Sequence, residues 1–482
     1  MSIKVYNSLT RTKEEFVPVT EGKVTMYVCG PTVYSLSHIG HARSAVSFDV
    51  IYRYLRYKGF EVTYARNYTD VDDKIIKKAN EEGSTSEEVA EKNIEAFDAD
   101  MAALGVLLPT HRPRATTTMG EIIKMTKRLI DKGYAYELEG DVYFSVRKAK
   151  NYGMLSGRNI DELESGARVG VDERKQDPLD FALWKTSKPG EPSWESPWGK
   201  GRPGWHIECS AMCMKWLGET VDIHGGGKDL IFPHHENEIA QSESATGKPY
   251  VKYWLHNGFV NIEKEKMSKS IGNILNIRDV LEGHTSEAVR MFLLSAQYRS
   301  PIDYSEGSLK DAEAAMERYY KTVQRIEREW PDAVSTGGST AYSTDSGDEM
   351  FAPIFEAMDD DFNTASVIGS IFKEVTRANR IMDEAKGEGK GNAARELSKI
   401  MSFFSVAGKV LGTFDKTAGE YFSGRFAGSS IDAGEIEKLI GERNAARKNK
   451  DFKKADAIRD ELAAKGVVLE DAAGKTTWSV KG

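Results

Sequence analysis

Residues 24–30 are Val-Thr-Met-Tyr-Val-Cys-Gly, a β-rich apolar run that ends in a glycine before a polar turn. This run predicts a buried strand that leads into a loop. From 38 to 58 apolar residues recur at three- and four-residue steps until Gly59, which predicts a helix, and a second strand is expected over 60–67. Strand, helix and strand with short joints indicate a βαβ unit. Its parallel strands would place a ligand beyond their carboxyl ends.

The segment after this unit has a different pattern. Between 109 and 204 helix and hairpin signals are mixed, and 189–205 is rich in Pro, Gly and Trp. We interpret this segment as an insertion between two halves of one sheet. The second half is expected to resume with a helix over 205–217, a short strand over 221–227 that leads into a triple-glycine loop, and a helix from about 233 to 246.

The last third of the chain is mainly helical in pattern. A charged amphipathic helix is predicted over 308–330, and a surface linker over 331–348, which is rich in Ser, Thr and Gly and has no apolar period. Helical patterns return over 350–386 and 392–411. A last unit from about 431 is expected to contain a helix hairpin and a strand.

Composition limits the class of protein. The chain has 482 residues, of which 40% are hydrophobic and 29% charged. These values indicate about three globular domains and exclude collagen-like, coiled-coil and wholly disordered chains. No stretch approaches the roughly 20 apolar residues of a membrane span, and the first residues lack a signal-peptide apolar region, so we expect a cytoplasmic protein with no membrane partner. Three cysteines do not suit a disulfide framework, and a net charge of −8 leaves any RNA contact to local patches.

The motif His38-Ile39-Gly40-His41 stands where the first strand leads into its helix. A helix N-terminus presents unpaired N–H groups and the positive end of the helix dipole, so a nucleotide phosphate fits there and two imidazoles add donors. Gly40 leaves room for an adenine ring. The alternative is that both histidines cap the helix or fill the core.

A second motif, Lys266-Met267-Ser268-Lys269-Ser270, lies far along the chain. Two flexible ammonium groups beside hydroxyls can hold a triphosphate and neutralise the departing pyrophosphate. Alone, such a run is more typical of a solvated charged loop. Together with the first motif, it indicates ATP binding.

A third group of residues has the chemistry of a metal site. If a helix begins near residue 233, His234 and Glu238 project from the same face, Cys209 supplies a thiolate, and Cys29 lies at the carboxyl end of the first strand. These four residues can converge on one Zn²⁺, because thiolate and imidazole donors favour zinc. Cys213 is an alternative ligand, since it follows Cys209 by four residues. Alternatively, the cysteines are simply packed in the core.

Both ATP motifs resemble the two signatures of the class I aminoacyl-tRNA synthetases, in the expected order. The resemblance extends to the cysteine-specific branch of that family through residues 27–34, 67–74, 204–210, 224–230 and 232–238. It implies an α/β fold, with a Rossmann-like parallel-sheet catalytic domain that carries an insertion, an α-helical bundle domain and a small C-terminal α+β anticodon-binding domain. The implied boundaries are 1–110 and 204–265 for the two catalytic halves, 111–203 for the connective insertion, 266–310 for the second motif and a stem-contact region, 311–425 for the bundle with a linker over 331–349, and 431–482 for the anticodon-binding domain.

The resemblance implies an enzyme that activates L-cysteine with ATP, releases pyrophosphate and transfers cysteine to the 3′ end of tRNA(Cys). It assigns one zinc ion to Cys29, Cys209, His234 and Glu238, leaves Cys213 structural, and has the zinc bind the substrate thiolate. The residues expected to stabilise charge in catalysis are His38, His41, Lys266 and Lys269. The nucleotide site would add Gly40, Gly225, Gly226, Gly227, Asp229 and Ser268, and the amino-acid pocket Thr69, Trp205 and His206. The cations and the aromatic residue expected to contact tRNA are Arg447, Lys448 and Trp478.

The expected partners are tRNA(Cys), L-cysteine, and ATP with Mg²⁺, and a monomer is expected. Two alternatives remain at this point. The chain can be a cysteine ligase that passes cysteine to a sugar amine, or a catalytically silent RNA-binding protein that contains zinc. The helical and basic segment after residue 310 argues against the first, and the two intact ATP motifs argue against the second.

Overall fold

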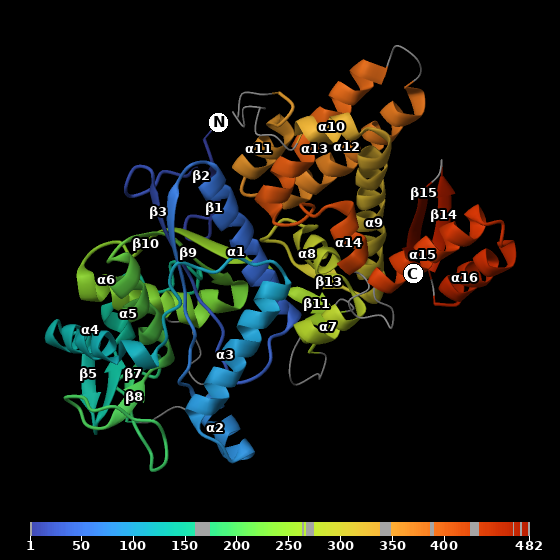
Figure 1. Ribbon diagram of the computed structural model, residues 1–482. Coiled ribbons are helices and arrows are strands. Elements are labelled where there is room, and N and C mark those ends of the chain that lie inside the picture. The colour runs from blue at the N-terminus through green and yellow to red at the C-terminus, as the bar shows by residue number, and fades with distance from the viewer. Residues whose placement is uncertain are drawn as a thin grey trace. The chain divides into compact units, whose positions relative to one another are not determined.

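The computed structural model describes residues 2–159, 174–262, 265–266, 274–337, 349–385, 390–424, 433–465, 467–472 and 475–480 (Figure 1). The chain forms two compact units. The first contains residues 1–312, 342–374 and 402–414, and the second contains residues 313–341, 375–401 and 415–482. Each unit therefore combines separated parts of the sequence.

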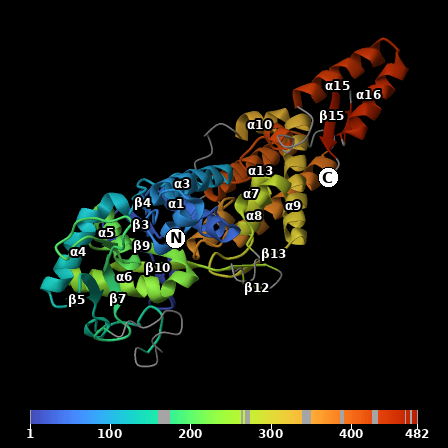
Figure 2. The same ribbon diagram turned by 90° about the horizontal axis from the view of Figure 1, so that it is seen from below.

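The first unit is built around a parallel sheet with the strand order β10-β9-β3-β4. Its strands are β3 (Lys23–Val28), β4 (Glu61–Arg66), β9 (Val221–Gly227) and β10 (Val251–Asn257). The helices around it are α1 (Ile39–Tyr57), α4 (Met119–Asp131), α5 (Trp205–Leu217) and α6 (Glu236–Thr246). In Figures 1 and 2, α1 covers one face, while α5 covers the other face beside α4 and α6. The predicted βαβ unit is confirmed, and the strand order places a switch point between β3 and β9, where such sheets bind ligands.

A separate antiparallel sheet lies between the two halves of the parallel sheet in chain order, as the mixed pattern predicts. Its strands pair in sequence order. They are β5 (Ala135–Leu138), β6 (Asp141–Phe144), β7 (Phe181–Thr186) and β8 (Gly201–Pro203).

The remaining elements of the first unit are shorter or lie at its edges. They are β1 (Lys4–Asn7), β2 (Thr12–Glu15), α2 (Asp73–Glu82), α3 (Ser86–Ala103), η1 (Thr116–Thr118), η2 (Val146–Lys148), η4 (Lys228–Leu230), η5 (Ile231–His235), β11 (Val260–Ile262), β12 (Glu265–Lys266), α7 (Ile277–Gly283), α8 (Ser286–Leu294), β13 (Ile302–Tyr304) and α11 (Ala352–Asp359). Three long helices run from one unit into the other, namely α9 (Glu306–Glu329), α12 (Thr364–Glu384) and α13 (Lys390–Leu411). The second unit also contains α10 (Pro331–Gly337), α14 (Ala418–Gly424), α15 (Ala433–Lys448), α16 (Phe452–Ala464), β14 (Val467–Ala472) and β15 (Lys475–Val480).

The structure differs from the sequence prediction at the expected linker. Its first seven residues form α10, because Pro331 suits the first position of a helix and Ala333 is buried; residues 338–348 lie outside the described residues. The helical pattern predicted over 350–386 is confirmed as two helices, α11 and α12. The break between them is at Asp361 and Phe362, whose φ angles are 63° and 55°. The carboxylate of Asp361 accepts hydrogen bonds from Tyr6 N and Tyr298 Oη, which lie far away in sequence.

Across the described segments, no helix is both long enough and apolar enough to span a membrane.

The buried carboxylate of Asp49 fixes α1 to its surroundings. It accepts from Arg53 Nε at 2.8 Å and from Leu107 N at 2.8 Å, and it pairs with Arg290 of α8. Arg290 also donates to the carbonyl oxygens of Leu411 and Leu104 at 2.8 and 3.0 Å. The side chains of Arg290 and Asp49 are 2% and 0% exposed. The buried Asp49–Arg290 ion pair therefore links α1 to α8 and to the backbone at Leu104 and Leu411.

We expect Arg290→Met to lower the free energy of unfolding by about 3 kcal/mol, because the carboxylate of Asp49 stays buried and loses one of its two cationic partners. Urea unfolding followed by circular dichroism measures this change. Arg459→Met is the matched control, since Arg459 pairs with Asp456 and Asp460 on the surface and such pairs contribute less than about 1 kcal/mol. Equal stability of both variants would contradict the prediction.

Candidate active site and metal centre

A cavity of about 610 Å³ opens at the carboxyl ends of the parallel strands, where the sequence predicts ligand binding. It lies at the switch point between β3 and β9. Cys29 and Gly30 follow β3, Thr69 follows β4, and Gly227 ends β9. The lining also includes Pro31, Thr32, His38, Gly40, His41, Trp205, Cys209, Asp229, His234 and Ile274.

The first motif forms the N-terminus of α1 at the wall of this cavity. His38 is the N-cap, and its backbone N–H donates to Nδ1 of His41 at 3.3 Å in a capping box. The two imidazoles stack with their ring centroids 3.8 Å apart. His38, Gly40 and His41 all line the cavity. The histidines therefore cap the helix and also face the space where a nucleotide would bind, so the two interpretations of the motif are compatible.

Four predicted metal ligands converge at one end of the cavity. One donor atom each from Cys29, Cys209, His234 and Glu238 lies within 4.8 Å of the others, and all four residues are buried. His234 Nε2 lies 3.0 Å from Glu238 Oε1, one helical turn away, and the thiol of Cys29 donates to the same oxygen at 3.4 Å. Cys29, Cys209 and His234 line the cavity, whereas Glu238 does not. Two sulfurs, one imidazole and one carboxylate fit tetrahedral Zn²⁺ with an approach from the cavity side.

The electrostatics of this group suit a cation. A hydrogen bond from Cys29 lowers the pKa of Cys209 to about 6 against the effect of burial. Burial would lower the pKa of His234, but Cys209 and Glu238 outweigh it and raise that pKa to about 10. Burial opposes the charge on Glu238, yet His224 and His234 hold its pKa well below the usual range. Cys209 therefore offers a thiolate near neutral pH, the form that binds metals.

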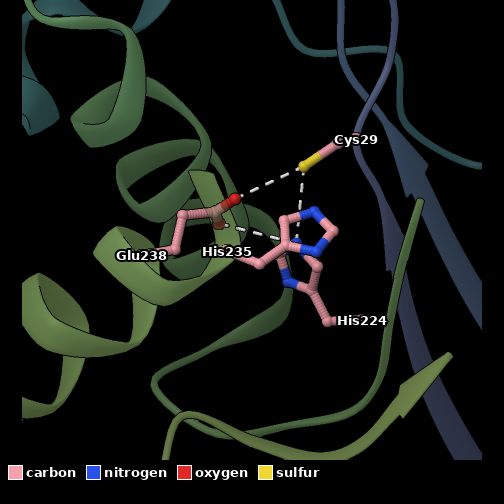
Figure 3. A group of neighbouring side chains, drawn as sticks. All are labelled: Cys29, His224, His235 and Glu238. Carbon is pink, nitrogen blue, oxygen red and sulfur yellow. Dashed lines mark hydrogen bonds and ion pairs between the residues drawn. The ribbon is translucent and has the colours of Figure 1, made fainter. Parts of the chain in front are cut away.

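The structure adds two histidines that the sequence analysis did not assign. Cys29, His224, His235 and Glu238 form a second group of donor atoms within 4.8 Å of one another (Figure 3). His224 Nε2 lies 3.5 Å from both Cys29 Sγ and Glu238 Oε2. Neither His224 nor His235 lines the cavity. The group therefore shares Cys29 and Glu238 with the predicted site, and of its four residues only Cys29 lines the cavity.

His224 was not predicted as a donor because its position depends on the register between two strands that are far apart in sequence. His224 lies on β9 directly opposite Tyr27 of β3. Tyr27 is two residues before Cys29, so the pairing brings His224 beside the cysteine. His224 belongs to the motif over 224–230, but the motif alone does not give the register between strands that are far apart in sequence.

Cys213 does not join either group of donors among the described residues. It is fully buried on α5, and a hydrogen bond links it to the phenol of Tyr250. Tyr250 in turn donates to Glu238 Oε2 at 3.1 Å. Cys213 therefore supports Tyr250, which in turn is hydrogen-bonded to the predicted ligand Glu238, in agreement with the structural role expected for it.

The expected amino-acid pocket is only partly assembled as predicted. Thr69 and Trp205 line the cavity, and the Trp205 indole stacks on the His234 ring with centroids 4.3 Å apart. His206 does not line it, and its Nδ1 lies 3.0 Å from Nδ1 of His234. Trp205 is thus an apolar wall of the cavity beside the predicted ligand His234, and His206 contacts His234 without lining the cavity.

The three glycines that were expected to form a loop are instead the last three residues of β9, paired with β10, and they differ in position. Gly227 and Asp229 line the cavity, but Gly225 and Gly226 do not. A Cβ atom on Gly225 would lie 2.2 Å from the Phe48 ring of α1. Gly225 is therefore needed for close packing of β9 against α1, and the expectation that it approaches adenosine has no support in its position.

Several predicted residues lie at the limit of the described chain. Lys266 ends β12, opposite Asn261, but its side chain, together with Ser268 and Lys269, lies outside the described residues. Ile274, which follows the motif, lines the cavity. At the C-terminus, Arg447 pairs with Asp471 at 2.6 Å and Lys448 is exposed. Trp478 lies on β15 opposite Leu469, and its side chain is outside the described residues.

Known proteins match the whole length of the chain. Residues 15–314 match the family model of the class I (C) tRNA synthetase catalytic domain, residues 354–415 the DALR domain, and residues 433–478 the cysteinyl-tRNA ligase anticodon binding domain. The chain is 56% identical to the cysteine–tRNA ligase of Geobacter metallireducens and 55% identical to that of Geotalea uraniireducens, with 100% of each chain covered.

A solved structure of Mycobacterium tuberculosis methionyl-tRNA synthetase in complex with methionyl-adenylate is similar in fold. Its TM-score is 0.59 at 15% identity, and the match covers 83% of this chain and 92% of that one. Together with the family models, this similarity confirms the expected α/β catalytic fold followed by helical domains.

We expect Gly225→Ala to destabilise the protein by about 1–3 kcal/mol, because the added methyl group meets the Phe48 ring. Thermal unfolding measures the loss. Phe48→Leu is expected to recover part of it when combined with Gly225→Ala, since the shorter side chain vacates the space. A double variant that is no more stable than Gly225→Ala would show that another contact is responsible.

Proposed function

The chain belongs to the cysteine–tRNA ligases, a family of class I aminoacyl-tRNA synthetases, and we propose that it selects cysteine through a zinc ion held by Cys29, Cys209, His234 and Glu238. The single observation that carries this proposal is the convergence of these four buried donors on the cavity that the α1 histidines also line. A sulfur-binding centre and a phosphate-binding helix end then share one crevice. That arrangement suits adenylate formation on a thiol-bearing amino acid.

The selectivity has a physical basis in the donor set. When bound, Zn²⁺ supplies a soft Lewis acid that lowers the pKa of the substrate thiol and binds its sulfur. A serine hydroxyl is harder to ionise and is a poorer ligand, whereas an apolar pocket separates such near-isosteres by only about 1–3 kcal/mol. Trp205, stacked on His234, gives the apolar wall beside the sulfur. Four protein ligands would already fill a tetrahedral zinc site, so cysteine would enter as a fifth ligand or displace Glu238, which does not itself line the cavity.

The activation step needs no nucleophile from the protein. The cysteine carboxylate attacks the α-phosphate of ATP, the bond to the β-phosphate breaks, and pyrophosphate leaves, with Mg²⁺ accompanying the phosphates. His38 and His41 stand at the N-terminus of α1, where donors and the helix dipole stabilise the developing charge. Lys266, Ser268 and Lys269 are proposed to hold the departing pyrophosphate. Gly40, Gly227 and Asp229 are proposed to surround adenosine, since all three line the cavity.

We propose that tRNA(Cys) contacts the C-terminal elements, which match the anticodon binding domain. The expected contacts are Lys448, Arg447 and Trp478. Arg447 already pairs with Asp471, so a contact there would have to share or break that pair. Phe452, which begins α16, is 61% exposed and was not singled out from the sequence. An exposed ring beside Lys453 and Lys454 suits stacking on an unpaired base.

The two alternative functions are weaker. A ligase that passes cysteine to a sugar amine has no use for the anticodon binding domain matched at 433–478. A silent RNA-binding protein has no use for a phosphate-binding helix end beside the metal ligands. We propose that the enzyme acts as a monomer in the cytoplasm, where tRNA is charged for translation.

We expect Cys209→Ser to lose zinc and to lower cysteine-dependent exchange of pyrophosphate into ATP by about 100-fold or more, since a hydroxyl replaces a thiolate ligand. Metal analysis and the exchange assay measure the two effects. Cys213→Ala is the matched control, because Cys213 lies one helical turn away and outside both donor groups. A Cys209→Ser enzyme that keeps its zinc and its exchange activity would refute the assignment.

Chelation of the wild-type enzyme is expected to abolish cysteine-dependent exchange, and added Zn²⁺ is expected to restore it. The reason is that the substrate thiol depends on the metal for its binding energy and its deprotonation. Serine is expected to support no exchange in either state. Full activity of the metal-free enzyme toward cysteine would exclude the zinc mechanism.

A further inference from the structure

The loops that follow β3 and β4 remain paired beyond the ends of their strands. Thr32 and Thr69 form a parallel bridge. Thr69 N donates to the carbonyl of Pro31 at 3.1 Å, and Val33 N donates to the carbonyl of Thr69 at 3.2 Å. These two loops form one wall of the cavity. Their spacing therefore sets the shape of the amino-acid site.

One buried amide joins the two loops where they leave the sheet. Asn67 is 0% exposed, and its Oδ1 accepts from Gly30 N at 2.8 Å. Its Nδ2 donates to Thr69 Oγ1 at 3.4 Å. A Cβ atom on Gly30 would lie 1.7 Å from the carbonyl oxygen of Asn67, so only glycine allows the loops to come this close. Both ends of this bridge belong to residues that line the cavity.

The bridge connects two parts of the site that recognise different ends of an amino acid. Gly30 directly follows Cys29, whose backbone is fixed to β9 by a hydrogen bond from Cys29 N to the carbonyl of Gly225 at 3.0 Å. Thr69 lines the same cavity, so its hydroxyl is a candidate contact for the α-amino or carboxyl group of the substrate. Asn67 thus ties the sulfur-binding centre to this hydroxyl.

A zinc centre alone cannot choose among thiols. Homocysteine carries the same thiol on a chain that is one methylene longer, which moves its α-amino and carboxyl groups by about 1.5 Å. A metal that accepts one of these sulfurs accepts the other. Selection between the two amino acids therefore requires a fixed distance from the metal to the groups that hold the α-carbon end.

We propose that Asn67 is a positioning residue that sets this distance, so that the site accepts cysteine and rejects homocysteine. The inference rests on the proposed zinc mechanism. It adds to the selection for a thiol a second selection, for the length of the amino-acid side chain. Asn67 touches no substrate and acts through Thr69 and Gly30. Because its amide is fully buried and bonded at both ends, the two loops cannot separate to admit the longer chain without breaking a buried hydrogen bond.

The test compares kcat/KM for cysteine and for homocysteine in pyrophosphate exchange, with zinc content measured on each variant. Asn67→Leu keeps a side chain of similar shape but removes both the acceptor for Gly30 N and the donor to Thr69 Oγ1. We expect the preference for cysteine over homocysteine to fall by about tenfold, the scale of one methylene in a pocket, with zinc retained. Asn67→Asp can still accept from Gly30 N and from the Thr69 hydroxyl, so it is expected to keep most of the preference.

Asn7→Leu is the matched control. Asn7 is also buried, and its side-chain oxygen accepts from Leu9 N and Trp254 N away from the cavity, so its variant is expected to leave the preference unchanged. Equal losses of kcat/KM for both amino acids in Asn67→Leu would overturn the proposal and leave a purely structural role. An unchanged preference would also overturn it. Failure of the wild-type enzyme to use cysteine at all would instead refute the proposed function.

Discussion

The carboxylate of Glu238 is the constraint on which the site depends. It is fully buried, and its two oxygens contact His234, Cys29, His224 and the phenol of Tyr250. A carboxylate buried in this way is stable only when it is paired and hydrogen-bonded. Its partners come from β9, from the end of β3, from η5 directly before its own helix, and from Tyr250 directly before β10. The demand for charge compensation therefore holds together segments that are far apart in sequence, and the same compensation can be met by a metal ion.

The cavity combines two kinds of proposed site at the carboxyl edge of one sheet. Cys29, Cys209 and His234 line it as proposed sulfur-binding ligands, and His38, Gly40 and His41 line it at the N-terminus of α1, where phosphate is proposed to bind. The paired loops after β3 and β4 line the same cavity. A parallel sheet suits this arrangement, because all of its strands deliver their last residues to the same edge.

Local features were predictable from the sequence, and long-range ones were not. The bounds of α5 and β9 agree with the prediction, and the four-residue spacing of His234 and Glu238 placed them on one face, because these features follow from periodicity and turn residues. The position of His224 beside Cys29 depends on the register between β9 and β3. The helix break at Asp361 depends on its hydrogen bonds with Tyr6 and Tyr298. Gly225 is required because of its contact with Phe48, and no local sequence pattern encodes such contacts.

The distance in sequence between Cys29 and Glu238 also has a consequence for the biosynthesis of this protein. The two residues whose side chains meet in the folded chain are 209 positions apart. At about 5–20 residues per second, a ribosome needs about 10–40 seconds to make the second after the first. For that interval the nascent chain carries Cys29 without its carboxylate partner, so the proposed metal centre can form only once most of the catalytic domain has been translated.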